Sequence, residues 1–178
     1  MKKIVSLLII LSCYSQIEAQ KPNYNPFKVD VITGIGASQS AVGFAVAIEP
    51  KYNFSNSFSA GLRWENAQMY SLKEVSGGIL TSGPNGWVNS FVLTGEFYAW
   101  QDLDLFRPFI GGGTGIYLAN FDVAKGRDTN AKIGFALSGG FQIRHLRLVA
   151  ENNFIPDENF NLNYFTLKIG LTLGGKNR

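Results

Sequence analysis

One short stretch of the sequence has the composition of a loop that binds phosphate. Residues 107–117 read RPFIGGGTGIY and place four glycines within positions 111–115. A phosphate-binding loop follows the pattern G-x-x-x-x-G-K-[ST] between a strand and a helix, because its backbone amides and its lysine surround the phosphate. Here no lysine and no helical pattern follow the glycines, and the residues alternate with a period of two. The stretch therefore predicts a β-strand with glycines concentrated on one face.

The residue types that carry hydrolytic or metal chemistry are scarce. His145 is the only histidine, in a short turn after Arg144, and Ser138 on the neighbouring segment lies several residues deeper. A hydrolase needs a nucleophile, a base and an orienting acid within reach. A metal centre needs a cluster of His, Cys or carboxylate ligands. The sequence offers neither arrangement, so it predicts no enzyme, no catalytic residues, no cofactor and no metal site.

The N-terminal segment has the parts of a signal for export. Lys2 and Lys3 precede an apolar run over residues 4–11, and Ala19 offers a small residue for cleavage. The run is shorter than the roughly 20 apolar residues of a transmembrane helix. The interpretation is a cleaved signal peptide at residues 1–19.

A second interpretation of the same segment is a lipoprotein signal. Residues 10–13 read ILSC and resemble a bacterial lipoprotein box, in which Cys13 is lipidated. Otherwise Cys13, the only cysteine, is lost with the signal, and the mature chain forms no disulfide. Cleavage after Ala19 removes two lysines and one glutamate, which reduces 16 basic and 13 acidic residues to 14 and 12. The remaining basic residues are dispersed, so no nucleic-acid partner is predicted.

After a lead-in at residues 20–26, the chain consists of alternating segments of the length that crosses a bilayer as a tilted strand, about 9–11 residues. The predicted fold is all-β: an eight-stranded antiparallel up-and-down transmembrane β-barrel over residues 27–173, with a polar, charged lumen and a C-terminal tail at 174–178. Long connections alternate with short ones, as in outer-membrane barrels; the long ones are 67–86, 119–130 and 155–161. The predicted strands are 27–37, 41–52, 57–66, 87–98, 107–118, 131–143, 146–154 and 163–173.

The two faces of the predicted strands differ in composition. One face is apolar, whereas the other carries charges together with ten of the glycines in the strands. Because the interior of an eight-stranded barrel just accommodates side chains, the crowded face is predicted to point inward, where glycine leaves room for long side chains. Charges there must pair to offset desolvation, which predicts a lumen ion network. Its predicted members are Lys28, Asp30, Glu49, Lys51, Arg63, Glu65, Glu96, Arg107, Lys132, Arg147, Glu151 and Lys168.

The apolar face carries aromatic residues near both ends of the strands. Aromatic girdles at the two interfaces are typical of membrane barrels. One predicted belt, near the short turns, contains Tyr52, Phe58, Phe97 and Phe141. The other, near the long loops, contains Trp64, Trp87, Phe154 and Phe165.

These features together resemble the small outer-membrane β-barrel family of the OmpA-barrel and OmpX-like type. The resemblance covers residues 27–173 and is carried by the export signal, by RPFIGGGTGIY and by the late segment NYFTLKIGLTLGG. The signal ending EAQ is similar to those of Bacteroidota barrels. Many relatives end on an aromatic residue that the assembly machinery reads, whereas this sequence ends GGKNR. The resemblance implies the outer membrane as location, with its lipid bilayer and its assembly machinery as partners.

The function predicted from the sequence is that of a non-enzymatic integral outer-membrane barrel with a packed charged interior, acting through surface loops or in envelope integrity. Two alternatives remain at this point: a pore for small solutes, and a soluble exported lipocalin-like barrel that binds an apolar ligand. Loop 67–86, with Tyr70, Leu72, Ile79 and Leu80, is predicted to form a protruding flap that binds a protein or glycan partner.

Overall fold

The computed structural model describes residues 26–38, 41–75, 78–99, 106–121, 129–156 and 163–174. It gives the backbone alone at 71–75, 78–85, 120–121 and 129–130. The predicted signal peptide, nearly all of the lead-in and residues 175–178 of the tail lie outside the described residues.

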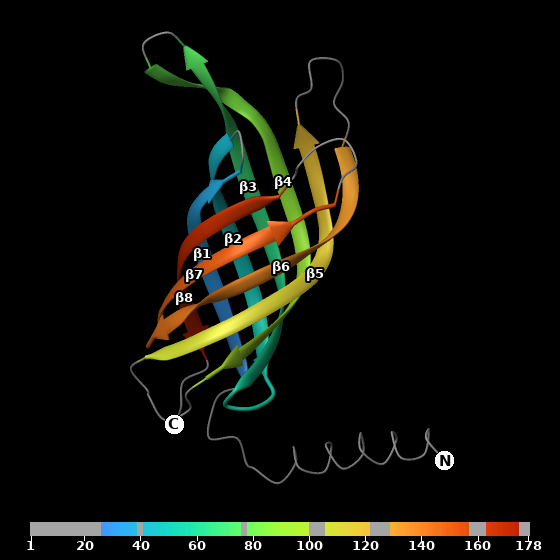
Figure 1. Ribbon diagram of the computed structural model, residues 1–178. Coiled ribbons are helices and arrows are strands. Elements are labelled where there is room, and N and C mark those ends of the chain that lie inside the picture. Colours follow the sequence, from blue (N-terminus) through green and yellow to red (C-terminus); the bar gives the residue numbers. More distant parts are fainter. Residues whose placement is uncertain are drawn as a thin grey trace, which may run out of the picture.

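Within these ranges the chain forms one closed antiparallel barrel of eight strands (Figure 1). Each strand pairs with its neighbours in sequence, and β8 pairs with β1 from Lys28↔Gly174 to Ala37↔Phe165. The predicted all-β, eight-stranded antiparallel fold is therefore confirmed. The strands are β1 (Phe27–Ala37), β2 (Ala41–Asn53), β3 (Phe58–Val75), β4 (Gly78–Tyr98), β5 (Arg107–Phe121), β6 (Thr129–Ile143), β7 (Leu146–Phe154) and β8 (Tyr164–Gly174).

The structure corrects the prediction of a loop at 67–86. β3 continues to Val75 and β4 begins at Gly78, so most of this segment is a hairpin. Glycines and prolines are typical of loops, but here the strands accommodate them through register shifts on either side of Tyr70, which pairs with Pro84. Likewise, β5 and β6 extend into the predicted loop 119–130.

The β3–β4 hairpin extends beyond the wall of the barrel. β2 pairs with β3 only as far as Ser71, and β5 pairs with β4 only from Gly86. The intervening residues therefore pair across the hairpin alone, from Leu72↔Thr81 to Val75↔Gly78. Figure 1 shows this ribbon standing above the end of the barrel opposite the start of β1 and the end of β8, which is here called the terminal end.

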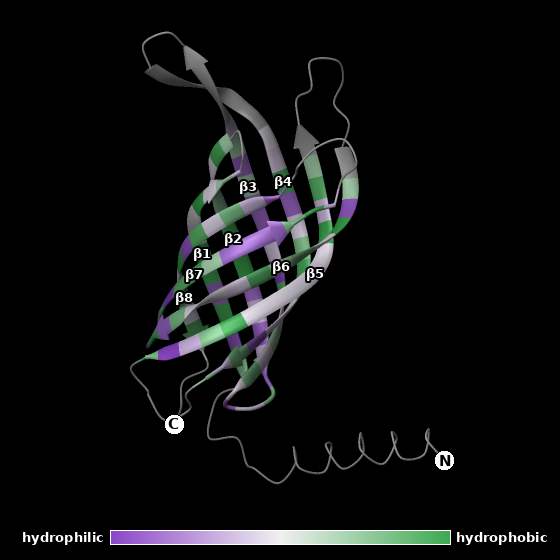
Figure 2. Ribbon diagram, viewed as in Figure 1, coloured by the Kyte–Doolittle hydropathy of each residue, from purple (hydrophilic) through white to green (hydrophobic). Residues whose placement is uncertain are grey.

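Burial alternates along each strand and separates a polar inside from an apolar outside. In β8, Tyr164, Thr166 and Lys168 are buried, while the residues between them are exposed. The outward side chains are large and apolar; Ile133 is 76% exposed and Ile110 is 69% exposed. Figure 2 shows the alternation as hydrophilic and hydrophobic bands along the strands. The apolar face thus points outward, as predicted.

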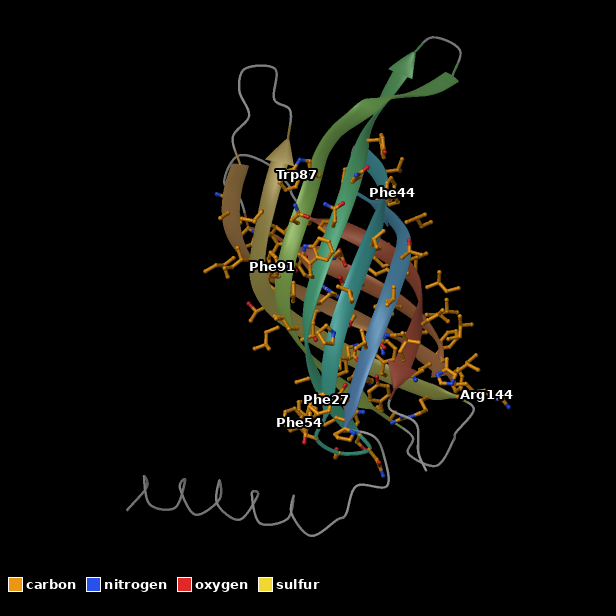
Figure 3. All side chains as sticks on the ribbon, turned by 180° about the vertical axis from the view of Figure 1, so that it is seen from behind. Phe27, Phe44, Phe54, Trp87, Phe91 and Arg144 are labelled. Carbon is orange, nitrogen blue, oxygen red and sulfur yellow. The ribbon has the colours of Figure 1, made fainter. Side chains whose placement is uncertain are left out.

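Aromatic residues gather on the outside near the terminal end of the barrel. The rings of Phe27 and Tyr52 contact edge to face at 5.1 Å, Tyr52 contacts Phe54 at 5.0 Å, and Phe54 contacts Phe58 at 5.7 Å. In Figure 3, Phe27 and Phe54 lie near this end, Phe44 lies near the opposite end, and Phe91 lies between them. These contacts connect four rings into one cluster, which contains Tyr52 and Phe58 of the predicted belt.

Two kinds of close approach explain the inward glycines. At Gly61 an added Cβ would lie 2.6 Å from Lys51 Cγ, so this glycine makes room for a long side chain as the sequence predicted. At Gly115 an added Cβ would instead lie 2.0 Å from the carbonyl oxygen of Phe91 on β4. There the glycine is required because the neighbouring backbone itself comes close, which the prediction did not include.

Replacing Gly115 by alanine is expected to lower the free energy of unfolding by about 1–3 kcal/mol, the usual cost of overpacking. Gly95 provides the control, since its added Cβ would point outward with its first contact 3.8 Å away on Phe58. Gly95→Ala is therefore expected to leave stability unchanged or slightly raised. Urea unfolding of the refolded barrel measures both, and equal effects of the two changes would contradict this account of Gly115.

Candidate functional site: the charged lumen

The lumen contains two groups of ion pairs at different depths. The group nearer the terminal end, here called the lower tier, has three cationic and three anionic side chains. Its members come from four strands and are all buried: Lys28, Asp30, Glu49, Lys51, Glu96 and Arg147. With equal numbers of each sign, the lower tier has no formal net charge.

Lys51 is the centre of the lower tier. Its Nζ lies 2.6 Å from Asp30 Oδ2, 2.7 Å from Glu96 Oε1 and 3.1 Å from Glu49 Oε2. Arg147 forms a second ion pair with Glu96 through Nη2. One lysine therefore holds carboxylates from β1, β2 and β4, and the arginine connects them to β7.

Neutral hydroxyl groups add hydrogen bonds to the lower tier. Tyr98 donates a hydrogen bond to Glu96 at 2.9 Å and accepts from Lys28 Nζ at 2.6 Å and from Arg147 Nη1 at 3.0 Å. Thr94 donates to Glu49 at 2.5 Å. Hydrogen bonds to carboxylates are stronger than those between neutral groups, so these hydroxyls stabilise the lower tier.

The second group, here called the upper tier, lies deeper toward the long loops. It has two cations and two anions: Arg63, Glu65, Glu151 and Lys168. Lys168 Nζ lies 2.9 Å from Glu151 Oε1 and also pairs with Glu65, and Arg63 pairs with Glu151. The upper tier is thus also balanced in charge.

Polar side chains again support these carboxylates. Tyr164 donates to Glu65 at 3.0 Å, and Asn153 donates to Glu151 at 3.0 Å. Tyr117 on β5 donates to Asn153 at 3.0 Å, so Asn153 links β5 to Glu151 on β7. These contacts fix both carboxylates of the upper tier by groups other than their cationic partners.

An apolar cap lies above the upper tier. Ile155, the residue after β7, is 2% exposed and packs with buried apolar side chains on the inner face of the barrel. Its backbone N–H donates to Asn163 Oδ1 at 2.8 Å, which ties the segment after β7 to the start of β8. Its partners in the cap include Met69, Val88, Ala119 and Tyr164.

Ten of the twelve predicted network residues are buried in the two tiers, and two lie elsewhere. Arg107 donates to the backbone oxygen of Asn56 at 2.7 Å, and its guanidinium lies 4.6 Å above the ring of Tyr98. Lys132 is half-buried on β6. Arg107 therefore covers the terminal end of the lumen and makes its hydrogen bond with the β2–β3 turn.

The network also contains neutral members, which the sequence-based prediction did not include. Tyr98 and Tyr164 each donate to a carboxylate of the network, and Tyr117 donates to Asn153, which in turn donates to Glu151. The signal was present in the alternation, because Tyr98 has the same parity as Glu96, and Tyr164 the same as Lys168. Ile155 gave no such signal, since it follows the end of its strand.

The middle of the lumen is tightly filled. A cavity between the tiers has about 10 Å³ open to a water-sized sphere, which is roughly the space that one water needs. In this part of the chain the charged side chains therefore occupy the lumen instead of lining an open channel.

The turn between β6 and β7 holds the single histidine. Arg144 has a φ of 52°, and His145 Nδ1 lies 3.0 Å from the backbone oxygen of Thr172. Across the described ranges, no group of three or more His, Cys, Asp or Glu side chains is arranged to hold a metal ion. Among the same residues, no helix is long and apolar enough to cross a bilayer.

Comparison with known proteins gives matches of structure and none of sequence. No protein-family model and no curated protein matches the chain. The crystal structure of neisserial surface protein A (NspA) matches with a TM-score of 0.66 and 16% identity, covering 85% of this chain and 98% of that one. The N-terminal β-barrel domain of OprF from Pseudomonas aeruginosa matches with a TM-score of 0.54 and 8% identity, covering 84% and 99%. The fold is that of the small outer-membrane β-barrels.

Proposed function

We propose that the chain is a non-enzymatic integral protein of the bacterial outer membrane, with a closed, charged interior, acting through its surface or in envelope integrity. The observation that carries the proposal is the combination of ion pairs inside with an apolar belt outside. Among the described residues, 28 large apolar side chains are exposed. Such a surface far exceeds the apolar patches of soluble proteins, and lipid tails are the surroundings that it fits.

Residues at the N-terminus support the same location. The predicted signal peptide at 1–19 would export the chain across the inner membrane. The strands would then reach the outer membrane through its assembly machinery, with the lipid bilayer as their main partner. The fold shared with NspA and OprF supports this proposal.

The two alternative functions have less support. A lipocalin-like barrel would need an apolar interior, whereas Leu93 and Ile169 point outward and Lys51 points inward. A pore would need an open lumen, whereas the described middle of the lumen is filled by the two tiers.

A test of location combines cell fractionation with gel mobility. The outer-membrane fraction is run in SDS with and without boiling, because a closed membrane barrel resists SDS and migrates differently until heated. We expect the protein in this fraction, with a mobility shift on boiling. Recovery in the soluble periplasm without a shift would contradict the proposal.

The β3–β4 hairpin is the proposed contact site for a protein or glycan partner. It extends past the last pairs with β2 and β5, so it reaches beyond the barrel wall. Because the described residues 72–75 and 78–81 pair only with each other across the hairpin, they contribute little to the closure of the barrel.

Deletion of residues 72–84 is therefore expected to leave the barrel folded, with the same heat-dependent mobility shift as the full chain. The matched control deletes four residues of the wall, Val88–Phe91, which pair with both β3 and β5. That deletion is expected to abolish the shift. Loss of the shift in the hairpin deletion would show that the hairpin supports the barrel instead of extending from it.

A further inference from the structure

The cavity in the middle of the lumen is built from both tiers. Residues of all eight strands line it, and its polar walls include Glu49, Glu96 and Arg147 of the lower tier and Arg63, Glu151 and Lys168 of the upper tier. Its open volume of about 10 Å³ is close to the minimum that holds one water molecule. The cavity is therefore a site of defined size between two groups of ion pairs.

Two arginines beside this cavity have N–H groups that find no acceptor among the residues that the structure describes. These groups are Nε and Nη2 of Arg63 and Nε of Arg147, in side chains that are 94% and 99% buried. The carboxylates facing the Nε atoms are too distant for a direct hydrogen bond: Glu65 Oε2 is 3.8 Å from Arg63 and Asp30 Oδ2 is 3.6 Å from Arg147. Buried donors of this kind are strongly disfavoured without an acceptor, and water commonly spans polar gaps of this length.

The charges around the cavity determine whether an ion or a water molecule can bind in it. Each tier is already neutral, so an ion would bring a charge that nothing balances. An anion would also face the three carboxylates of the wall, and a cation would face its two guanidinium groups and its lysine. A water molecule accepts from N–H groups and donates to carboxylates at once, which fits a wall of both kinds.

We propose that one water molecule binds in this cavity and accepts hydrogen bonds from the guanidinium groups of Arg63 and Arg147. It joins the lower and upper tiers into one network through the lumen. This inference rests on the proposed function, in which the interior of the barrel is closed. It adds a bound water molecule that helps to fill that interior.

The test is a high-resolution crystal structure of the refolded barrel, grown with sodium bromide in place of chloride. We expect an electron-density peak in the cavity, about 2.7–3.2 Å from a nitrogen of each arginine, without anomalous signal from bromine. An anomalous peak there would identify an anion site and overturn the proposal. An empty or collapsed cavity would overturn it as well.

A variant of the cavity wall tests whether the water depends on the polar groups and the size of this cavity. Ser138 lines the cavity, and Ser138→Val replaces its hydroxyl by a methyl group and adds a second methyl, which reduces the space. We expect loss of the peak and earlier unfolding in urea. Leu137→Val is the control, because Leu137 is outward-facing on the same strand and 56% exposed; it is expected to retain the peak. A peak that persists in Ser138→Val would contradict the proposed position.

NMR of the barrel in micelles gives an independent reading. The Nε–H signals of Arg63 and Arg147 are expected to show cross-peaks to a slowly exchanging water, whereas exposed Arg144 shows only rapid exchange with bulk solvent. Absence of these cross-peaks in folded protein would overturn the proposal. Cell fractionation tests the location separately. A protein found outside the membrane would overturn the proposed function, whereas the electron density in the cavity would still test the bound water.

Discussion

Replacing Lys51 by methionine is expected to lower the free energy of unfolding by about 3–5 kcal/mol, the cost of breaking a buried ion pair by removing one partner. Lys51 holds three carboxylates at 2.6–3.1 Å, and its removal leaves the lower tier with one excess negative charge. Methionine keeps the length and volume of the side chain, so the change isolates the charge. Urea unfolding of the barrel in lipid vesicles, followed by gel mobility, measures the loss.

A second substitution that restores the charge balance shows how much of the stability lost in Lys51→Met is electrostatic. In the double variant Lys51→Met with Glu49→Gln, the tier again has equal numbers of cations and anions, so part of the lost stability is expected to return. Lys132→Met is the exposure control, because Lys132 is only half-buried, and it is expected to cost less than about 1 kcal/mol. Equal losses for Lys51→Met and Lys132→Met would show that the lower tier is not the main ionic support of the lumen.

Replacing Leu93 by arginine is expected to destabilise the barrel by about 2–4 kcal/mol in a bilayer, because it places a charge among lipid tails near mid-depth. Leu93 faces outward on β4 and is 62% exposed. A soluble barrel would tolerate the same change, since an exposed arginine is solvated by water. The equilibrium stability in vesicles, compared with that of the original protein, therefore tests which medium surrounds the outer face.

The same substitution nearer the end of the barrel provides the control. Phe27 is 67% exposed but begins β1 in the aromatic belt at the terminal end. Phe27→Arg is expected to cost only about 0–1 kcal/mol, the range found near the membrane interface. Equal costs at Leu93 and Phe27 would argue against a bilayer around the middle of the strands.

Much of this fold could be predicted from the alternation of polar and apolar residues along the sequence. A strand places every second side chain on the same face, so the charges of β2 and β8 could be assigned to one side without knowledge of their partners. The exposed belt and the buried tiers follow from that assignment. The ends of β3 and β4 did not follow, because glycine and Pro84 resemble loop signals and only the paired backbone shows that a shifted register accommodates them.

Some of the ion pairs could not be assigned from sequence because they cross the lumen. Lys51 pairs with Glu96, and Arg63 pairs with Glu151, between strands that are not neighbours in the sheet. Such contacts depend on the stagger of the strands around the barrel, which alternation does not contain. The position of Ile155 depends on the path of the chain after β7, for which the sequence carried no periodic signal.

The pairing of β1 with β8 has a consequence for how the chain reaches its native state. Lys28 pairs with Gly174, so the closing ladder joins residues separated by almost the whole barrel sequence. Topologies with such distant contacts fold slowly, because the entropy of closing the chain is lost before the contacts form. Until β8 arrives, every partly folded form has two open sheet edges that invite aggregation. Chains that stop before β8 are therefore expected to aggregate or to be degraded, because they cannot form the closing ladder with β1.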